Sequence, residues 1–182
     1  MTKRYEDTRP VDTNPKNKTV AGSRVRMNEL VMPNDTNTLG NLMGGKLLMW
    51  MDICSAIAAQ RHCNRLVVTV SVDSVEFRSG IRLGEVVVIE GEVTRAFTTS
   101  MEIAMQAWAE NLRTGERRLC TTSYYTFVAV DADGKPVPVP PIQPETEYET
   151  IRYEQAIERR TNRLELSQKT TSLSETRGNS QE

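Results

Sequence analysis

The stretch that decides the fold is residues 43–60, which read MGGKLLMWMDICSAIAAQ. It is long, contains no proline and is rich in Leu, Met and Ala, so it favours an α-helix with two glycines at its start. Apolar or small side chains recur at helical spacing and share one face of this helix: Leu47, Leu48, Met51, Cys54, Ser55 and Ala58. Three further apolar side chains lie off that face: Trp50, Ile53 and Ile57. A helix that is apolar nearly all round is a buried helix, so we expect one sheet to wrap around it.

Five stretches with strand character surround this predicted helix. One precedes it and four follow: residues 25–32, then 68–77, 85–95, 101–108 and 119–130. In the first stretch after the helix the apolar positions change parity, which predicts a β-bulge near Asp73 or Ser74. Short turns join the last four stretches, so these strands are mostly antiparallel. The sequence therefore predicts an α+β fold in which a curved antiparallel sheet of about five strands wraps one long buried helix.

The apolar segments occupy the middle of the chain, and both ends are polar. The ends lack the periodicity of a packed core element, and five prolines fall between residues 136 and 144. We expect a flexible N-terminal arm at residues 1–22 and the main domain at 23–135. A proline-rich linker at 136–144, a charged C-terminal helix at 145–167 and a disordered tail at 168–182 follow.

Composition argues against several functional classes. The 23 Lys and Arg nearly balance the 24 Asp and Glu of the 182 residues, so we expect no nucleic-acid partner. The longest apolar run has five residues, whereas a bilayer span needs about 20, and we expect neither a membrane segment nor a secretory signal. The three cysteines lack metal-ligand or CxxC spacing, so they predict reduced thiols in a cytoplasmic protein without a metal site: Cys54, Cys63 and Cys120.

Residues that can carry chemistry gather between positions 33 and 52. A loop of turn-forming residues leads to Gly44 and Gly45 at the predicted helix start, where the first backbone amides have no partner within the helix. The helix dipole adds partial positive charge at this end, so it can receive a carbonyl or an oxyanion. The alternative interpretation is that the glycines only let the helix pass close to a neighbouring strand.

Asp52 is the strongest candidate for a catalytic group. None of its neighbours three and four residues away along the helix is a cation: Leu48, Met49, Ser55 and Ala56. An unpaired carboxylate in a largely buried helix is costly, and such groups are often kept for proton transfer or nucleophilic attack. The alternatives are an Asp at a solvated subunit boundary, or one in a salt bridge with a distant arginine: Arg61, Arg65 or Arg78.

Residues 31–52, VMPNDTNTLGNLMGGKLLMWMD, resemble the signature of the hotdog-fold acyl-CoA thioesterases of the YciA and brain acyl-CoA hydrolase type. The likeness covers roughly residues 23–165 and includes four further elements: residues 67–77, the Gly84-Glu85 turn, the Thr99-Ser100 pair and the strand at 125–130. The resemblance implies a hotdog fold, dimers formed by sheet continuation and commonly a trimer of dimers, that is, a homo-hexamer. It also implies active sites between subunits.

The resemblance assigns catalytic roles to single residues. The family's catalytic carboxylate matches Asp52, and its loop asparagine matches Asn37. The paired glycines whose amides meet the thioester carbonyl match Gly44 and Gly45. Met43 stands where some relatives have histidine, which removes a polar contact with the substrate.

Candidates for binding the CoA part of a substrate are weaker. Thr99 and Ser100 open a strand at the position where relatives often touch the nucleotide. Basic residues near the inferred cleft can hold phosphates, among them Lys46, Arg78 and Arg82. The single histidine, His62, follows the helix without a nucleophile motif around it, so we interpret it as a helix C-terminal cation or a surface residue.

Together these residues favour an acyl-CoA thioester hydrolase, which converts acyl-CoA and water to a free fatty acid and CoA. Asp52 would be the general base or, alternatively, the nucleophile. CoA is then part of the substrate and product, and no separate cofactor is expected. Two other classes stay open: a hotdog hydratase or dehydratase, which usually needs a histidine in the cleft, and a non-catalytic acyl-CoA sensor.

Overall fold

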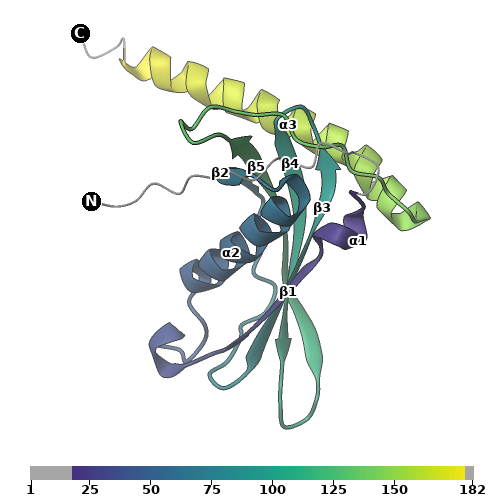
Figure 1. The fold of residues 1–182 in the computed structure, drawn as a ribbon. Helices are drawn as coiled ribbons and strands as arrows, with labels where there is room; N and C mark the ends of the chain where they lie inside the picture. Colours follow the sequence, from purple (N-terminus) through teal and green to yellow (C-terminus); the bar gives the residue numbers. More distant parts are fainter. Residues whose placement is uncertain (1–17, 179–182) are drawn as a thin grey trace, which may run out of the picture.

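The computed structural model describes residues 18–178, with the side chains of residues 18–169. Figure 1 shows a long helix against a curved sheet and a second long helix across one end of it. The elements in chain order are α1 (Val20–Ser23), β1 (Val25–Leu30), the short 3-10 helix η2 (Pro33–Asp35), α2 (Gly44–Cys63), β2 (Leu66–Asp73), β3 (Val86–Ala96), β4 (Ser100–Glu110), β5 (Arg117–Val130) and α3 (Glu147–Gly178).

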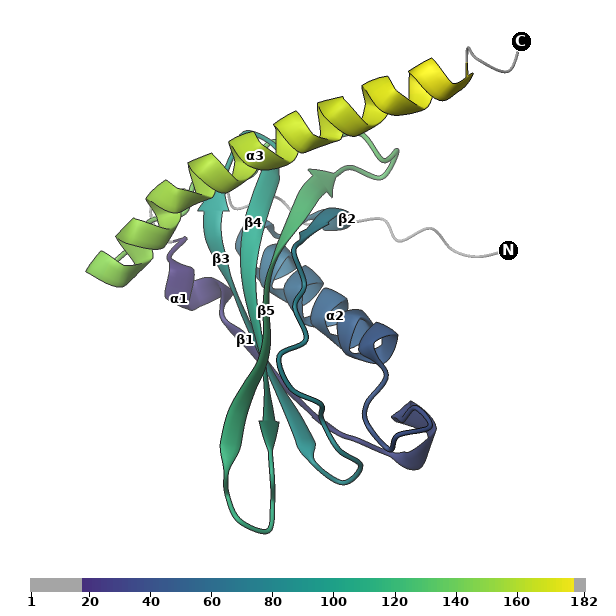
Figure 2. The same ribbon diagram turned by 180° about the vertical axis from the view of Figure 1, so that it is seen from behind.

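The five strands form one antiparallel sheet in the order β1-β3-β4-β5-β2. The two strands that flank α2 in the chain, β1 and β2, are therefore the two edges of the sheet. The views in Figures 1 and 2 place α2 on one face and α3 on the opposite face. The predicted α+β architecture, with a curved sheet around one long helix, is confirmed.

A close approach of α2 to β3 fixes the centre of the core. Cys54 lies on the buried face of α2, and a Cβ added at Gly91 of β3 would meet the Met105 sulfur at 2.6 Å and the Cys54 sulfur at 3.6 Å. Only glycine fits this contact without displacing its neighbours. The helix ends after Cys63, where Asn64 adopts the left-handed conformation, with φ +53°, that often closes a helix.

One side of α2 is not buried. Met49 and Ile53, one helical turn apart, stay exposed in the single chain, with 43 % of Ile53 accessible. This differs from the prediction of a helix buried nearly all round. The apolar side chains that the sequence shows outside the main face therefore form a strip that the described residues leave uncovered.

Edge strand β2 also differs from its prediction. It ends at Asp73 rather than near residue 77, and its register shift against β5 lies between Thr69 and Ser71, not near Asp73 or Ser74. Ser74 has φ +28°, which ends the extended conformation. The bulge was predicted from apolar alternation, but Val70 and its apolar neighbours in β2 remain exposed, so their pattern does not report packing against this chain's own core.

The structure differs from the predicted domain organisation at two places, the end of the N-terminal arm and the proline-rich segment. Val20 is buried, and residues 18–22 dock rather than stay loose, with the amide of Gln143 donating to the Lys18 carbonyl. Residues 1–17 of the predicted arm lie outside the described residues. The segment 136–144 is not a free linker either, because Val139 and Ile142 are buried and the Val139 amide donates to Thr98 of the β3–β4 turn.

The charged C-terminal helix is present and longer than predicted. α3 runs from Glu147 to Gly178, past the predicted end at residue 167, because the sequence offers no proline or glycine before Gly178 to stop it. The predicted boundary at residue 168 therefore falls within α3, and residues 179–182 of the predicted tail lie outside the described part. Arg159 anchors the helix, since it pairs at 2.8 Å with the fully buried Glu102 of β4 and stacks on Tyr124 of β5.

Candidate active site

Asp52 and Thr69 form the centre of the candidate site. Asp52 is half-buried on α2, and the Thr69 hydroxyl on β2 donates a hydrogen bond of 2.8 Å to its Oδ1. No ion pair to Asp52 is present among residues 18–169, so the salt-bridge alternative is not supported; Arg61, for instance, donates to the Arg24 carbonyl instead. Within the described residues, a neutral hydroxyl rather than a cation therefore holds this carboxylate.

Thr69 is a residue that sequence reasoning missed. It stands in an edge strand among exposed valines, and nothing in its local pattern points to a function. Its register partner is Phe127 of β5, a core residue, so Thr69 lies on the face of the sheet that carries α2. The bulge directly after it, at Val70, is a feature often found where a strand re-aims a side chain beside a site.

The two helix-start glycines have different environments. A Cβ at Gly44 would lie 3.1 Å from the Phe77 ring, so close packing accounts for this glycine. At Gly45 a Cβ would meet nothing within 4 Å, so packing within the chain gives no reason for glycine there. The N-cap residue Met43 makes no side-chain cap, and the helix start stays open to an outside acceptor.

Asn37 organises the loop before the helix. Its Oδ1 accepts hydrogen bonds from the amides of Leu39 at 2.9 Å and Asn41 at 3.2 Å, and its side-chain NH₂ has no hydrogen-bond partner among the described residues. The Met43 amide donates to the Asp35 carbonyl, and this bond joins the loop to the start of α2. Asn37 and the glycines therefore belong to one end of the subunit.

Asp52 does not lie at that end. It follows Gly44 by eight residues, which is about 12 Å along the helix axis. A single carbonyl cannot contact the Gly44 amide and the Asp52 carboxylate of the same α2 at hydrogen-bond distance. Within one chain the predicted catalytic residues are split between the end and the middle of the helix.

The predicted CoA-binding residues are also split. Lys46 pairs with Asp35 at 3.3 Å and lies over the Trp50 ring. Arg82 is exposed and forms a backbone β-bridge with Asn41 beside the start of α2, and Arg78 is exposed in the same 74–85 segment. Thr99 lies in the β3–β4 turn and Ser100 begins β4, at the far end of the eleven-residue strand β3 and about 30 Å from the helix-start end. One chain does not bring these two groups together.

His62 fits neither alternative predicted for it, a helix C-terminal cation or a surface residue. It is buried near the end of α2, where its Nε2 lies 2.8 Å from the Pro140 carbonyl. Burial lowers the pKa of the imidazole, and the nearby Lys18 ammonium lowers it further. His62 therefore holds the proline-rich segment as a neutral side chain and lies away from Asp52.

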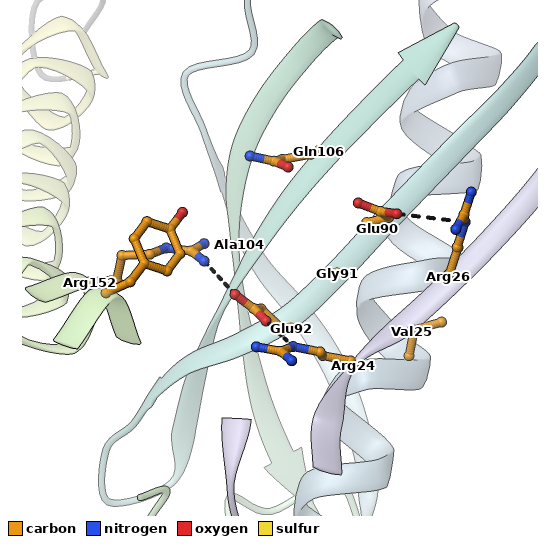
Figure 3. Close-up of a pocket in the computed structure, with 10 residues that line it drawn as sticks. Arg24, Val25, Arg26, Glu90, Gly91, Glu92, Ala104, Gln106 and Arg152 are labelled. Carbon is orange, nitrogen blue, oxygen red and sulfur yellow. Dashed lines mark hydrogen bonds and ion pairs between the residues drawn. The ribbon is translucent and has the colours of Figure 1, made fainter. Parts of the chain in front are cut away.

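Two cavities of the single chain lie outside this site. One, of about 450 Å³, is on the outer sheet face (Figure 3), where Glu92 pairs with Arg24 and Arg152 and Glu90 pairs with Arg26. The other, of about 730 Å³, lies between α3 and the outer side of β2 and β5. Neither is lined by a predicted catalytic residue. Among the described residues no group of three or more His, Cys, Asp or Glu side chains is placed to bind a metal ion.

The comparisons with known proteins decide the family. The model of the thioesterase superfamily matches residues 39–116. A Bacillus subtilis (strain 168) protein described as the uncharacterized acyl-CoA thioester hydrolase YkhA is 46% identical over 149 residues, covering 80% of this chain and 87% of that protein. The chain belongs to the thioesterase superfamily. This finding confirms the family that the sequence predicts.

Solved thioesterase structures agree with this assignment. A hexameric acyl-CoA thioesterase in its apo form superposes with a TM-score of 0.79 at 46% identity, covering 82% of this chain and 96% of that one. An acyl-CoA hydrolase from Staphylococcus aureus, solved with butyryl-CoA, CoA and CoA disulfide, gives a TM-score of 0.78 at 36% identity, covering 85% of this chain and 96% of that one.

In the present chain, no helix within residues 18–178 has both the length and the apolar character that a membrane span needs.

Proposed function

We propose that this protein hydrolyses the thioester bond of acyl-CoA and releases a carboxylate and CoA. The observation that carries the proposal is the Asp52 carboxylate, which Thr69 holds on the uncovered side of α2 without a neutralising cation. The names of the similar proteins, acyl-CoA thioester hydrolase and acyl-CoA thioesterase, support this substrate class.

Residue spacing supports the assignment of the three polar side chains. Solved variants of the S. aureus hydrolase replace an asparagine, an aspartate and a threonine with alanine, one at a time, at positions separated by 15 and then 17 residues. Asn37, Asp52 and Thr69 are separated by the same 15 and 17 residues. We infer that the three act together, with Thr69 orienting Asp52 and Asn37 orienting the carbonyl or the water.

The chemistry is general-base hydrolysis. Asp52 takes a proton from water as the water oxygen attacks the thioester carbonyl carbon. The amides of Gly44 and Gly45 receive the developing oxyanion, a contribution of about 2.7 to 4 kcal/mol for each well-placed donor. Collapse of the tetrahedral intermediate breaks the carbon–sulfur bond, and the proton on Asp52 passes to the CoA thiolate. The alternative role of Asp52, direct attack to form a mixed anhydride, uses the same carboxylate.

The split site implies that two subunits complete each other. Edge strand β2 offers unpaired backbone groups, and both β2 and α2 carry exposed apolar side chains: Val68 and Val70 on β2, with 60 % of Val70 accessible, and Met49 and Ile53 on α2. Antiparallel pairing of two β2 strands about a two-fold axis would continue the sheet and set the two α2 helices side by side in opposite directions. The glycines and Asn37 of one chain would then approach Asp52 of the other.

The proposal extends to the larger assembly, the contacts with CoA and the cellular compartment. We propose a trimer of dimers, as in the similar thioesterase described as hexameric. Arg78 and Arg82 are exposed and make no ion pair with another described residue, whereas Lys46 is paired with Asp35, so the two arginines are the better candidates for the CoA phosphates. Thr99 and Ser100 would reach the nucleotide from another subunit. The three buried free cysteines suit a reducing, cytoplasmic compartment.

The proposal is tested by following free thiol release from a panel of short to long acyl-CoAs. We expect turnover with at least part of the panel and no change in absorbance with an enoyl-CoA. Loss of enoyl absorbance would favour the hydratase, and a raised Tm with acyl-CoA but no thiol release would favour the sensor.

Thr69→Ala is expected to lower kcat about tenfold, because it removes the hydrogen bond by which Thr69 orients the Asp52 carboxylate. Thr69→Ser keeps the hydroxyl and should retain most of the activity. The same thiol assay measures both variants. Equal losses in the alanine and serine variants would show that the hydroxyl is not what matters.

A further inference from the structure

Tyr125 of β5 carries a buried hydroxyl that the mechanism above does not use. The residue is 1% exposed, and its hydroxyl has no hydrogen-bond partner within the described residues. Buried hydroxyls in native proteins are nearly always paired with protein or ordered water, so an unpaired one indicates a missing partner.

The hydroxyl belongs to the same face and the same region as Asp52. Thr69, which holds Asp52, is the register partner of Phe127, and Tyr125 is two residues before Phe127 on the same strand. Side chains two apart on a strand share a face, so Tyr125 lies beneath α2, with Val72 as its register partner in β2.

Electrostatics agrees with this placement. Burial raises the pKa of the Tyr125 phenol to about 12, and the charge of Asp52 contributes to the rise. The phenol therefore stays protonated at every working pH and is a hydrogen-bond donor close enough to feel the carboxylate.

Asp52 provides a hydrogen-bond acceptor to match the Tyr125 donor. Its Oδ1 accepts from Thr69, and its Oδ2 has no partner in the part of the chain that the structure describes. Tyr125 and Asp52 make no direct hydrogen bond with each other. A donor and an acceptor that face one region without touching are suited to hold a small group between them, and water is the smallest that can bridge both.

We propose that Tyr125 is a positioning residue that donates a hydrogen bond to the water molecule that Asp52 deprotonates. The inference rests on the proposed thioester hydrolysis. The water oxygen accepts from the Tyr125 hydroxyl, donates one proton to Asp52 Oδ2 and uses its remaining lone pair to attack the carbonyl carbon. The carbon–oxygen bond forms, the carbon–sulfur bond breaks, the proton leaves Asp52 for the CoA thiolate, and Tyr125 keeps its own proton throughout.

Tyr125→Phe tests this role, because it removes only the hydroxyl. We expect kcat for butyryl-CoA to fall about tenfold with KM changed less than twofold, and to fall by a similar factor for other acyl lengths. The Tm should not decrease, because the lost group has no partner in the folded chain. The matched control is Tyr124→Phe, the neighbouring residue on the outer face against Arg159, which should keep the wild-type kcat.

A double variant separates a positioning role from a general structural effect. If Tyr125 acts through the water that Asp52 activates, Asp52→Asn with Tyr125→Phe should be no slower than Asp52→Asn alone. An unchanged kcat in Tyr125→Phe would overturn the inference, and so would a loss that grows with acyl length, which would place the hydroxyl in the acyl channel. These outcomes leave the proposed function intact, whereas a wild-type chain that releases no thiol would remove both.

Discussion

Asp52→Asn is expected to lower kcat/KM for acyl-CoA by at least about a hundredfold, the lower end of what a positioned acid or base contributes. The change keeps the shape of the side chain and removes the charge. The amide can still accept from Thr69 through its oxygen, so the local packing and the hydrogen bond to β2 can persist. What disappears is the group that accepts a proton from water or attacks the thioester.

The measurement is thiol release at saturating and subsaturating acyl-CoA, with Tm determined for each protein. Asp133→Asn is the matched control, because it makes the same chemical change in an exposed turn after β5 and should keep wild-type activity. Retention of more than about a tenth of the wild-type kcat/KM by a folded Asp52→Asn protein would remove Asp52 from the mechanism.

Much of the fold could be predicted because its signals are local. The length and apolar character of residues 43–60 predict α2, and alternation predicts β3, β4 and β5 within a few residues of their observed ends. The prediction failed where packing against distant segments decides the structure. Residues 18–22 and the proline-rich segment look polar or extended locally, yet each is fixed by contact with the other.

The predictions for β2 and for the exposed strip on α2 failed for a related reason. Val70 and Ile53 look like core residues by pattern, but the structure leaves them exposed. A hydrophobic pattern reports burial without saying which chain provides the cover. The same limit explains why α2 was expected to be buried nearly all round.

The candidate site was partly predictable. Asp52 stands out because an unpaired carboxylate in an apolar helix is costly, and the two glycines stand out at the helix start. Thr69 and Tyr125 could not be found this way, because their importance comes from the register of β2 against β5 and from the position of α2 above it. Each looks by itself like an ordinary strand residue.

The second large effect is expected when two inactive chains are combined. Asn37→Ala and Asp52→Ala homo-oligomers should each have little activity, but a co-assembled oligomer should recover it. In a mixed dimer, one of the two sites receives Asn37 from the Asp52→Ala chain and Asp52 from the Asn37→Ala chain, so this site is complete. The other site lacks both. Random assembly of equal amounts should therefore restore roughly a quarter of the wild-type activity.

This expectation follows from the geometry of one helix. Because about 12 Å separate Gly44 from Asp52 along α2, and Asn37 lies at the glycine end, one chain cannot present all of them to a single carbonyl. Neither point depends on which acyl group is cleaved or on the size of the full assembly. A double variant that carries both substitutions in every chain is the control and should stay inactive.

The most direct test of a shared thioesterase site is therefore thiol release from an acyl-CoA by equal amounts of Asn37→Ala and Asp52→Ala chains, unfolded, mixed and refolded together. We predict recovery to roughly a quarter of the wild-type activity, well above either variant refolded alone. Activity no greater than the sum of the two separate variants, in oligomers shown to contain both chains, would contradict a site shared between subunits.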